Sequence, residues 1–320
     1  MFEDLSIGLW SLDSSHYWGE SKVDTATKIR AAAGIDGLGG VELIYPTQVN
    51  EANLAAVKKA CADGGLKVVS VNPNIWSDPL FAKGAYSSHD AQARKRAIDY
   101  GKASYDIAKE LGAGYMCLWP GQDGFDYPFQ CDYNELWARE KEGIAEVAAY
   151  AKGHRIGIEY KAREPRSHIL LDSASSVLLF ARWIDAKNVG IHLDFGHALL
   201  AKENPAESVF KAMSEDKLFG VHLNDNYGSS DEDMLPMSVH NLETMEFVHA
   251  LRSSRYAGWV SFEFLARSED PVESCALAIR NFRRLERALE RLDLPALAQA
   301  RAEHSVIRSL EIANSALMGA

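Results

Sequence analysis

Eight short runs of apolar residues recur along the chain and alternate with longer amphipathic stretches. The runs are rich in β-branched and aromatic residues, a pattern typical of parallel strands joined by crossover helices. Because nearly every run is continuously apolar, both faces of each strand are expected to be buried, as in a closed barrel. The sequence therefore predicts an α/β fold, a (β/α)8 TIM barrel. The expected strands are Leu5–Trp10, Val41–Tyr45, Lys67–Val71, Tyr115–Trp119, Arg155–Glu159, Val189–Asp194, Leu218–Leu223 and Trp259–Phe264.

Helix boundaries are marked by short polar residues and glycines between these runs. Asp90 precedes an expected helix over Ala91–Leu111, and Asp132 precedes one over Tyr133–Ala151. Short polar side chains in such places cap free backbone amides, and glycines such as Gly112 fall where a helix should end. We see no linker that would divide the barrel.

One catalytic barrel domain is therefore expected over residues 1–293. After it, Leu310, Ile312 and Leu317 recur at helical spacing. This predicts a C-terminal helical extension, residues 294–320, which is not an independent domain and packs under the barrel or on a neighbouring subunit.

Composition and charge argue against several classes of protein. The 320 residues are 47% hydrophobic and 25% charged, which is ordinary for a soluble globular chain. With a net charge of −11 and no block of Lys and Arg, no nucleic acid partner is expected. No signal peptide and no apolar stretch of about 18 residues is apparent, which predicts a cytoplasmic protein without a membrane partner. The four cysteines are scattered, which argues against disulfides and thiolate zinc sites and suggests buried thiols.

Four consecutive strands end on a carboxylate or an imidazole, and in such barrels the chemistry lies at these C-terminal strand ends. The four residues are Glu159, Asp194, His222 and Glu263. A charge at the mouth of an apolar strand is costly unless it is paired or binds a metal ion. The oxygen-rich set suits Mn²⁺, Mg²⁺ or Co²⁺, and we expect it to hold one such ion. Structural ion pairs are the alternative.

A second set of potential ligands lies nearby in the sequence. His197 follows Asp194 by three residues, and Asp231 and Asp233 follow the seventh strand. If Asp194 bridges the two sets, they could hold two ions, which would polarise a substrate oxygen and hold an activated water. The alternative for Asp231 and Asp233 is an acidic surface turn.

Lys161 lies two residues after Glu159, so strand alternation places both side chains on one face. A cation there could neutralise a substrate oxygen that gains charge, and a salt bridge to Glu159 is the alternative. His89 is an isolated loop histidine, and the residues alone do not single it out.

Aromatic residues gather at the predicted mouth of the barrel. An indole face can stack on the apolar face of a sugar, whereas filling the core is the alternative use. Amide side chains nearby could bind hydroxyl groups, and no glycine-rich phosphate loop follows any strand, so an unphosphorylated sugar is expected. These residues are Trp10, Tyr17, Trp18, Trp76, Trp119 and Phe125, with Asn72, Asn74 and Gln122.

The chain resembles the xylose-isomerase-like barrel superfamily, and most of all bacterial L-rhamnose isomerases of broad specificity. The resemblance covers roughly residues 5 to 290. It rests on the order and spacing of the segments 73–79, 88–90, 159–161, 194–197, 222–225 and 231–233.

The resemblance implies roles for individual residues. Glu159, Asp194, His222 and Glu263 would hold a structural metal ion, and Asp194, His197, Asp231 and Asp233 a catalytic one, with Mn²⁺ as the expected ion. His89 would assist opening of the sugar ring, Trp119 would form a wall, and Lys161 would bind the oxygen at C1. The resemblance and the C-terminal tail together suggest a homodimer or homotetramer.

Such enzymes interconvert an aldose and a ketose by a 1,2-hydride shift. Glu263 departs from the pattern, because rhamnose isomerases have Asp there and ketose 3-epimerases of the superfamily have Glu. A 3-epimerase that exchanges a carbon-bound proton through Glu159 and Glu263 is therefore an alternative. A metal-binding barrel subunit without isomerase activity of its own is another, and a zinc endonuclease is disfavoured by the negative charge.

Overall fold

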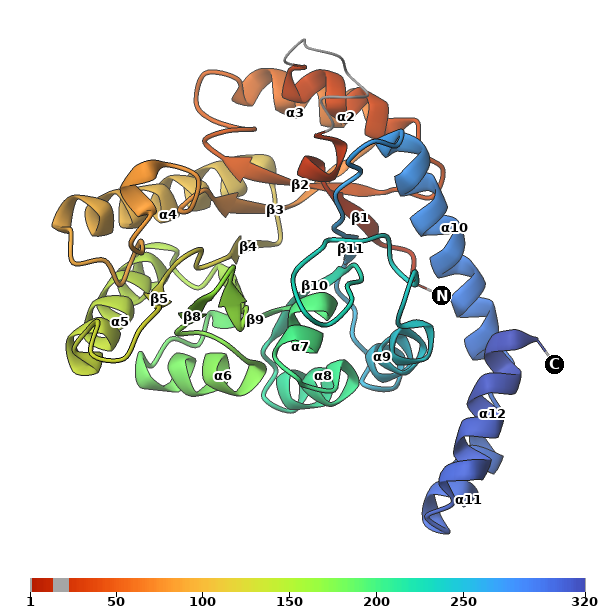
Figure 1. The fold of residues 1–320 in the computed structure, drawn as a ribbon. Helices are drawn as coiled ribbons and strands as arrows, with labels where there is room; N and C mark the ends of the chain where they lie inside the picture. The colour runs from red at the N-terminus through yellow and green to blue at the C-terminus, as the bar shows by residue number, and fades with distance from the viewer. Residues whose placement is uncertain (1, 14–22, 320) are drawn as a thin grey trace.

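The computed structural model describes residues 2–13 and 23–319. Within them, eight parallel strands close into a barrel in the order β1, β2, β3, β4, β6, β9, β10 and β11 (Figure 1). The predicted TIM barrel is therefore confirmed, with each observed strand inside or within two residues of its predicted range. The barrel strands are β1 Leu5–Gly8, β2 Gly40–Tyr45, β3 Lys67–Pro73, β4 Tyr115–Leu118, β6 Arg155–Glu159, β9 Val189–Asp194, β10 Leu218–Leu223 and β11 Val260–Phe262.

Helices follow the strands and cover the outside of the barrel (Figure 1). The helix predicted over Ala91–Leu111 has these bounds, and the one predicted to end at Ala151 ends one residue earlier. The helices are η1 Leu9–Leu12, α2 Thr25–Ala33, α3 Leu54–Gly64, η2 Pro79–Phe81, α4 Ala91–Leu111, α5 Tyr133–Tyr150, α6 Ala174–Trp183, α7 Phe195–Leu200, α8 Pro205–Ser214, α9 Asn241–Ser253 and α10 Pro271–Glu290.

The predicted helix caps form as expected. The Asp90 side chain accepts a hydrogen bond from the amide of Gln92, and Asp132 accepts from two amides in the first turn of α5. Helix α4 ends at Gly112, whose φ of 71° is a left-handed conformation that glycine adopts without strain. Local sequence signals thus mark the start of α4 and α5 and the end of α4.

A small antiparallel sheet accompanies the barrel and was not predicted. It consists of β5 Gly124–Phe125, β7 Arg163–Glu164 and β8 Ser167–Ile169, in the order β5, β8, β7. These strands belong to the loops that follow β4 and β6. The sheet therefore ties together two loops at the C-terminal end of the barrel.

The interior of the barrel is not wholly apolar. Glu42 on β2, His192 on β9 and His222 on β10 are completely buried. The rings of His192 and His222 pack with their centroids 3.9 Å apart, and Glu42 contacts His222. A polar layer therefore lies inside the barrel, directly beneath the strand ends.

The C-terminal tail forms two helices, α11 Leu294–Ala302 and α12 Val306–Met318. Helix α12 contacts α9 and α10, and both tail helices extend past the barrel at the blue end of the ribbon (Figure 1). Leu317 packs against the core, whereas Leu310 is 45% exposed. Within this chain, the tail lies beside the outer helices and not under the barrel.

The free cysteines are mostly, but not all, buried. Cys61, Cys117 and Cys275 are buried, whereas Cys131 is partly exposed, so the prediction of buried thiols is wrong for that residue. Cys131 lies next to the cap of α5, in the segment between β5 and that helix. No helix within the described residues is both long and apolar enough to cross a membrane.

Candidate metal and sugar site

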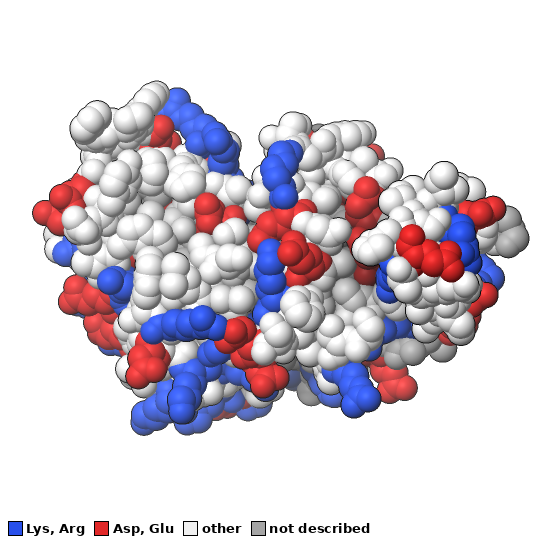
Figure 2. All heavy atoms as spheres, turned by 90° about the horizontal axis from the view of Figure 1, so that it is seen from below, with Lys and Arg blue, Asp and Glu red and all other residues white. Residues whose placement is uncertain are grey.

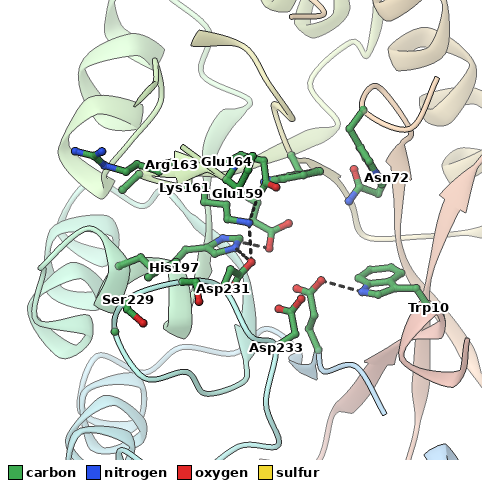
Figure 3. Close-up of a pocket in the computed structure, with 18 of the residues that line it drawn as sticks. Trp10, Asn72, Glu159, Lys161, Arg163, Glu164, His197, Ser229, Asp231 and Asp233 are labelled. Atoms are coloured by element: carbon green, nitrogen blue, oxygen red, sulfur yellow. Dashed lines mark hydrogen bonds and ion pairs between the residues drawn. The ribbon is translucent and has the colours of Figure 1, made fainter. Parts of the chain in front are cut away.

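A cavity of about 570 Å³ opens at the C-terminal end of the barrel. Its lining includes Glu159, Lys161, His197, Asp231 and Glu263, which were all predicted as site residues (Figure 3). The strand ends and the loop after β10 thus bring distant parts of the sequence to one place.

The first predicted ligand set forms one compact group. Each of Glu159, Asp194, His222 and Glu263 offers a ligand atom, and these atoms all lie within 4.8 Å of one another. Nδ1 of His222 lies 3.0 Å from a Glu159 oxygen and 2.6 Å from a Glu263 oxygen. Three carboxylates and one imidazole therefore converge as predicted.

The negative charge of this group shifts the pKa of His222. Burial alone would lower the pKa of His222, but the carboxylates of Glu263, Glu159 and Glu42 raise it well above its usual value. Burial raises the pKa of Asp194 to about 7, and the charges of Glu263 and Glu159 add to the rise. A divalent cation would counter both pKa shifts, because it would neutralise the carboxylates and take the place of the imidazole proton. The donor set thus fits an oxygen-preferring metal ion.

Asp194 is held by contacts on both of its oxygens. One oxygen accepts from the backbone amide of His197 over 2.7 Å, which caps helix α7. The other accepts from the side chain of Asn224 over 2.8 Å, and the Asn224 oxygen in turn accepts from the amide of Gly196. Capping and side-chain contacts therefore set the direction of this carboxylate.

The second predicted set lies beside the first but is less compact. Nε2 of His197 lies 3.1 Å from Asp231, and its Nδ1 lies 3.8 Å from Asp194 and 3.7 Å from Glu159. Burial and the charges of Asp231, Glu263 and Asp194 raise the pKa of Asp233 well above its usual range. Among the described residues, the ligand atoms of this second set do not all lie within 4.8 Å of one another, as those of the first set do.

The loop that carries Asp231 and Asp233 is anchored on both sides. Asp225 and Met234 exchange backbone hydrogen bonds of 3.0 and 2.9 Å. The amide of Leu265, after β11, donates to the carbonyl of Asp233 over 2.8 Å. These contacts hold the acidic turn at the cavity. The alternative expected from the sequence, an acidic turn on the outer surface, is therefore not what the structure shows.

Lys161 forms ion pairs with Asp231 and Glu164. The salt bridge to Glu159, which was the alternative in the sequence analysis, is not the contact observed. Its Nζ lies 2.7 Å from Asp231 and also contacts Glu164, which belongs to β7. The charges of these two carboxylates raise the pKa of Lys161 above its usual value despite burial. The ammonium also lies 5.3 Å from the centre of the Trp119 ring. Lys161 is thus a fixed cation on one wall of the cavity.

Three predicted aromatic residues line the cavity. Trp76 and Trp119 pack edge to face with centroids 4.9 Å apart. Trp10 donates from its indole nitrogen to Glu263 over 2.8 Å (Figure 3), a contact that the sequence did not reveal. The cavity therefore combines flat apolar surfaces with a concentrated set of charges.

Several predicted residues are not among the described residues that line the cavity, namely Asp194, His222, Gln122, His89, Asn74 and Phe125. Asp194 and His222 are completely buried and belong to the ligand group. His89 is exposed in the loop before α4, so nothing here brings it to the carboxylates. Asn74 is buried and accepts from the amide of Ser77, and Phe125 packs on Tyr133 and His168. Asn72 lies on the cavity wall instead. Tyr17 and Trp18 lie outside the described residues.

Sequence reasoning missed two buried residues beside the ligands. Glu42 contacts His222 from inside the barrel, and Cys117 Sγ donates to a Glu159 oxygen over 3.4 Å. Glu42 is an acid inside an apolar strand, which is itself a signal, because buried acids need partners. Cys117 carries no such signal, since a buried cysteine in a strand is ordinary.

Surface charge is mixed on the face seen from below. Lys and Arg side chains lie interspersed with Asp and Glu over that face (Figure 2). No block of one sign of charge dominates that face.

Comparison with known proteins identifies a family for the chain. Residues 29–292 match the model of the "Xylose isomerase-like TIM barrel" family. Xylose isomerase of Thermus thermophilus is 33% identical over 232 residues, which is 70% of this chain and 60% of that enzyme. Xylose isomerase of Thermus caldophilus is 30% identical over 67% of this chain and 57% of its own length. The matched region thus spans about three fifths of each enzyme.

Solved structures show the same fold at lower identity. A D-psicose 3-epimerase from Clostridium cellulolyticum H10 has a TM-score of 0.68 at 18% identity, covering 88% of this chain and 99% of its own. An L-ribulose 3-epimerase has a TM-score of 0.66 at 19% identity, covering 95% and 98%. These neighbours are ketose 3-epimerases, and a specific closeness to L-rhamnose isomerases is not shown. The chain belongs to the xylose isomerase-like TIM barrel family.

Proposed function

We propose that this protein is a divalent-metal-dependent isomerase that interconverts an unphosphorylated aldose and ketose. The observation that carries the proposal is the position of Asp231 and His197, 3.1 Å apart, against the group of four ligands in the same cavity. Glu159, Asp194, His222 and Glu263 would hold one ion. Asp194, His197, Asp231 and Asp233 would hold a second.

Bound divalent ions would polarise the sugar oxygens and stabilise the negative charge that develops on them. Lys161 supplies a fixed positive charge on the same wall, 2.7 Å from Asp231. The chain itself therefore offers a cation for the oxygen at C1 and a carboxylate for a hydroxyl proton. This arrangement suits a hydride shift between C1 and C2, because both oxygens remain neutralised while the hydride moves.

The walls of the cavity suit a neutral polyhydroxylated ligand. Trp76 and Trp119 present indole surfaces, and Asn72 adds an amide for hydroxyl groups. The two Thermus relatives are xylose isomerases, which agrees with a free sugar as the substrate. They match over about three fifths of their own length.

A ketose 3-epimerase is the second candidate. The compact ligand group contains two glutamates, Glu159 and Glu263, which both contact His222 Nδ1 and therefore converge on one point. Two such carboxylates could remove and return a proton at one carbon. Against this candidate stand Lys161 and the pair Asp231 and Asp233, which a one-metal epimerase would not need. The solved neighbours named as 3-epimerases support this candidate.

Incubation of the Mn²⁺-loaded protein in D₂O with a panel of free aldoses and ketoses would test the proposal. The products are analysed by NMR after the paramagnetic ion has been removed. Aldose–ketose conversion with little deuterium at C1 or C2 is the expected result. Deuterium at C3 of a ketose would establish the epimerase instead. Sugar binding without turnover would show a binding subunit.

A further inference from the structure

A buried carboxylate lies on the side of His222 that faces away from the ligand group. Oε2 of Glu42 is 3.3 Å from Nε2 of His222, and both side chains are completely buried. The other ring nitrogen, Nδ1, points to Glu159 and Glu263. The imidazole of His222 thus bridges the polar layer inside the barrel and the candidate metal site.

Glu42 is held in place without the help of His222. The Ser70 hydroxyl on β3 donates to the same oxygen, and the Tyr115 hydroxyl on β4 donates to the other oxygen over 3.4 Å. Both donors are buried. The carboxylate is therefore fixed by three neighbouring strands before it contacts the imidazole.

This geometry decides which nitrogen of a neutral His222 carries the proton. A neutral imidazole has one N–H and one lone pair. Without a cation the nearer acceptors are at Nδ1, because oxygens of Glu263 and Glu159 lie 2.6 and 3.0 Å from it. A cation held by these carboxylates would need the lone pair of Nδ1, and the fixed acceptor at Nε2 then holds the proton on its side. The lone pair then lies on Nδ1, which is the atom that faces the three carboxylate ligands. The opposite tautomer would place two acceptors, Nε2 and the Glu42 oxygen, against each other in a buried site.

We propose that Glu42 is a positioning residue that keeps His222 in the Nε2–H tautomer and so directs Nδ1 to a divalent cation. The inference rests on the proposed function only in that it takes the ligand group as a metal site. It holds equally for an isomerase and an epimerase. Glu42 itself is not among the described residues that line the cavity.

Glu42 could instead be a metal ligand itself, together with the two buried histidines. Glu42, His192 and His222 also offer ligand atoms within 4.8 Å of one another, and both ring nitrogens of His192 lack a hydrogen-bond partner within the described part of the chain. A metal ion bound among these three would make Glu42 a ligand. The Glu42 oxygen next to His222 already accepts from Ser70, which favours the positioning role.

The unmodified protein gives the first test. In protein labelled with ¹⁵N at histidine and loaded with Zn²⁺, long-range ¹H–¹⁵N correlation reports the state of each ring nitrogen. The His222 signal is identified by its loss in His222→Asn. We expect a proton on Nε2 and a metal-shifted Nδ1. A proton on Nδ1, or coordination through Nε2, would overturn the proposal, and this result does not depend on whether any Glu42 variant folds.

Variants give the second test, with Mn²⁺ affinity measured by electron paramagnetic resonance. Glu42→Leu removes the acceptor, and we expect Mn²⁺ binding about 10- to 100-fold weaker and a mixed tautomer at His222. Glu42→Gln keeps an oxygen acceptor, so its affinity should lie between those of Glu42→Leu and the wild type. Ser70→Ala is the matched control, because it removes a contact of Glu42 but none of His222, and should keep the tautomer.

The outcomes separate this inference from the proposed function. If Glu42→Leu retains the Nε2–H tautomer and wild-type affinity, the inference fails whatever sugar the protein converts. If both change as expected while the wild type converts no sugar, the inference stands and the isomerase fails. Loss of one of several bound ions in Glu42→Leu, with the Nδ1 site still filled, would show that Glu42 is a ligand and overturn the positioning role.

Discussion

The indole nitrogen of Trp10 donates a hydrogen bond to Oε1 of Glu263 over 2.8 Å, so one residue of the cavity wall also orients a carboxylate of the ligand group. The other oxygen of Glu263 lies 2.6 Å from Nδ1 of His222. Trp10 therefore sets which oxygen faces the point where a metal ion would bind. Trp10 therefore contacts the ligand group and also forms part of the cavity wall.

Trp10→Phe should weaken metal binding while it keeps an aromatic wall. Loss of the donor frees the Glu263 carboxylate to rotate, and contacts of this kind typically change metal affinity 10- to 100-fold. Titration with Mn²⁺ measures the effect. Trp76→Phe is the control, since Trp76 packs on Trp119 at the wall, and should leave Mn²⁺ affinity within about twofold of the wild type. Equal losses in both variants would contradict the role given to Trp10.

Asp231→Asn combined with Asp233→Asn should reduce sugar isomerisation by at least about 100-fold. The double change removes two carboxylates from the second ligand set, and electrostatic groups at developing charges are worth about that much in turnover. Steady-state kinetics with the sugar found in the D₂O experiment gives the measurement. Glu232→Gln is the control in the same turn, because Glu232 accepts from the amide of Tyr227 instead.

Unchanged isomerisation in that double variant would exclude the two-metal reading. The epimerase candidate makes the opposite prediction: activity survives the double change and is lost in Glu263→Gln. Metal content per chain provides an independent check, because the isomerase binds two ions in its ligand sets and the epimerase one.

Metal binding should release protons and strengthen as the pH rises. The charges of Asp194 and Asp231 outweigh burial and raise the pKa of His197 to about 10, while burial raises the pKa of Asp194 to about 7. At pH 7, His197 therefore holds its proton and Asp194 holds its proton in about half of the molecules, and a cation must displace these protons to reach the ligand atoms. Calorimetry in buffers of different ionisation enthalpy counts the protons. Affinity that does not change between pH 6 and pH 9 would contradict this linkage.

Glu140→Gln should stabilise the protein at neutral pH. Glu140 on α5 is completely buried, neither of its oxygens has a hydrogen-bond partner among the described residues, and burial together with the charge of Asp123 raises its pKa well above 4.5. Above pH 4.5 the unfolded chain gives up this proton more readily than the folded chain. Folding therefore loses stability as the pH rises towards the folded-state pKa.

Thermal and denaturant unfolding across the pH range would measure this effect. We expect a gain of about 1–3 kcal/mol for Glu140→Gln at neutral pH, which shrinks as the pH falls towards 4.5 and is absent below that pH. Glu142→Gln on the same helix is exposed and should stay within about 0.5 kcal/mol of the wild type throughout. A difference for Glu140→Gln that is constant with pH would point to packing and not to ionisation.

Sequence patterns predicted those parts of the molecule that depend on neighbours along the chain. Runs such as Val189–Asp194 reveal both a buried strand and the acid at its end, and the barrel topology then places Asp194 beside Glu159 and His222. The first ligand set was predictable because one rule, polar residues at C-terminal strand ends, covers all four members.

The remaining features depend on contacts between distant segments. Asp231, one partner of Lys161, is seventy residues away in sequence, and the loop after β10 brings it to the segment that follows β6. Alternation along one strand could only suggest Glu159 as the partner. Likewise, Glu42 and His222 meet across the barrel, a contact that no local pattern specifies.

The acidic turn after β10 is bound to Asp225 on one side and to the segment after β11 on the other. The wall that carries Asp231 and Asp233 is thus preorganised: its backbone entropy is lost during folding and not when a ligand arrives. A ligand that fits this wall gains the full interaction without a closing motion of the turn. The turn does not rearrange around a ligand of a different shape. Selectivity at this wall therefore depends on a shape and a charge distribution that are already fixed in the free protein.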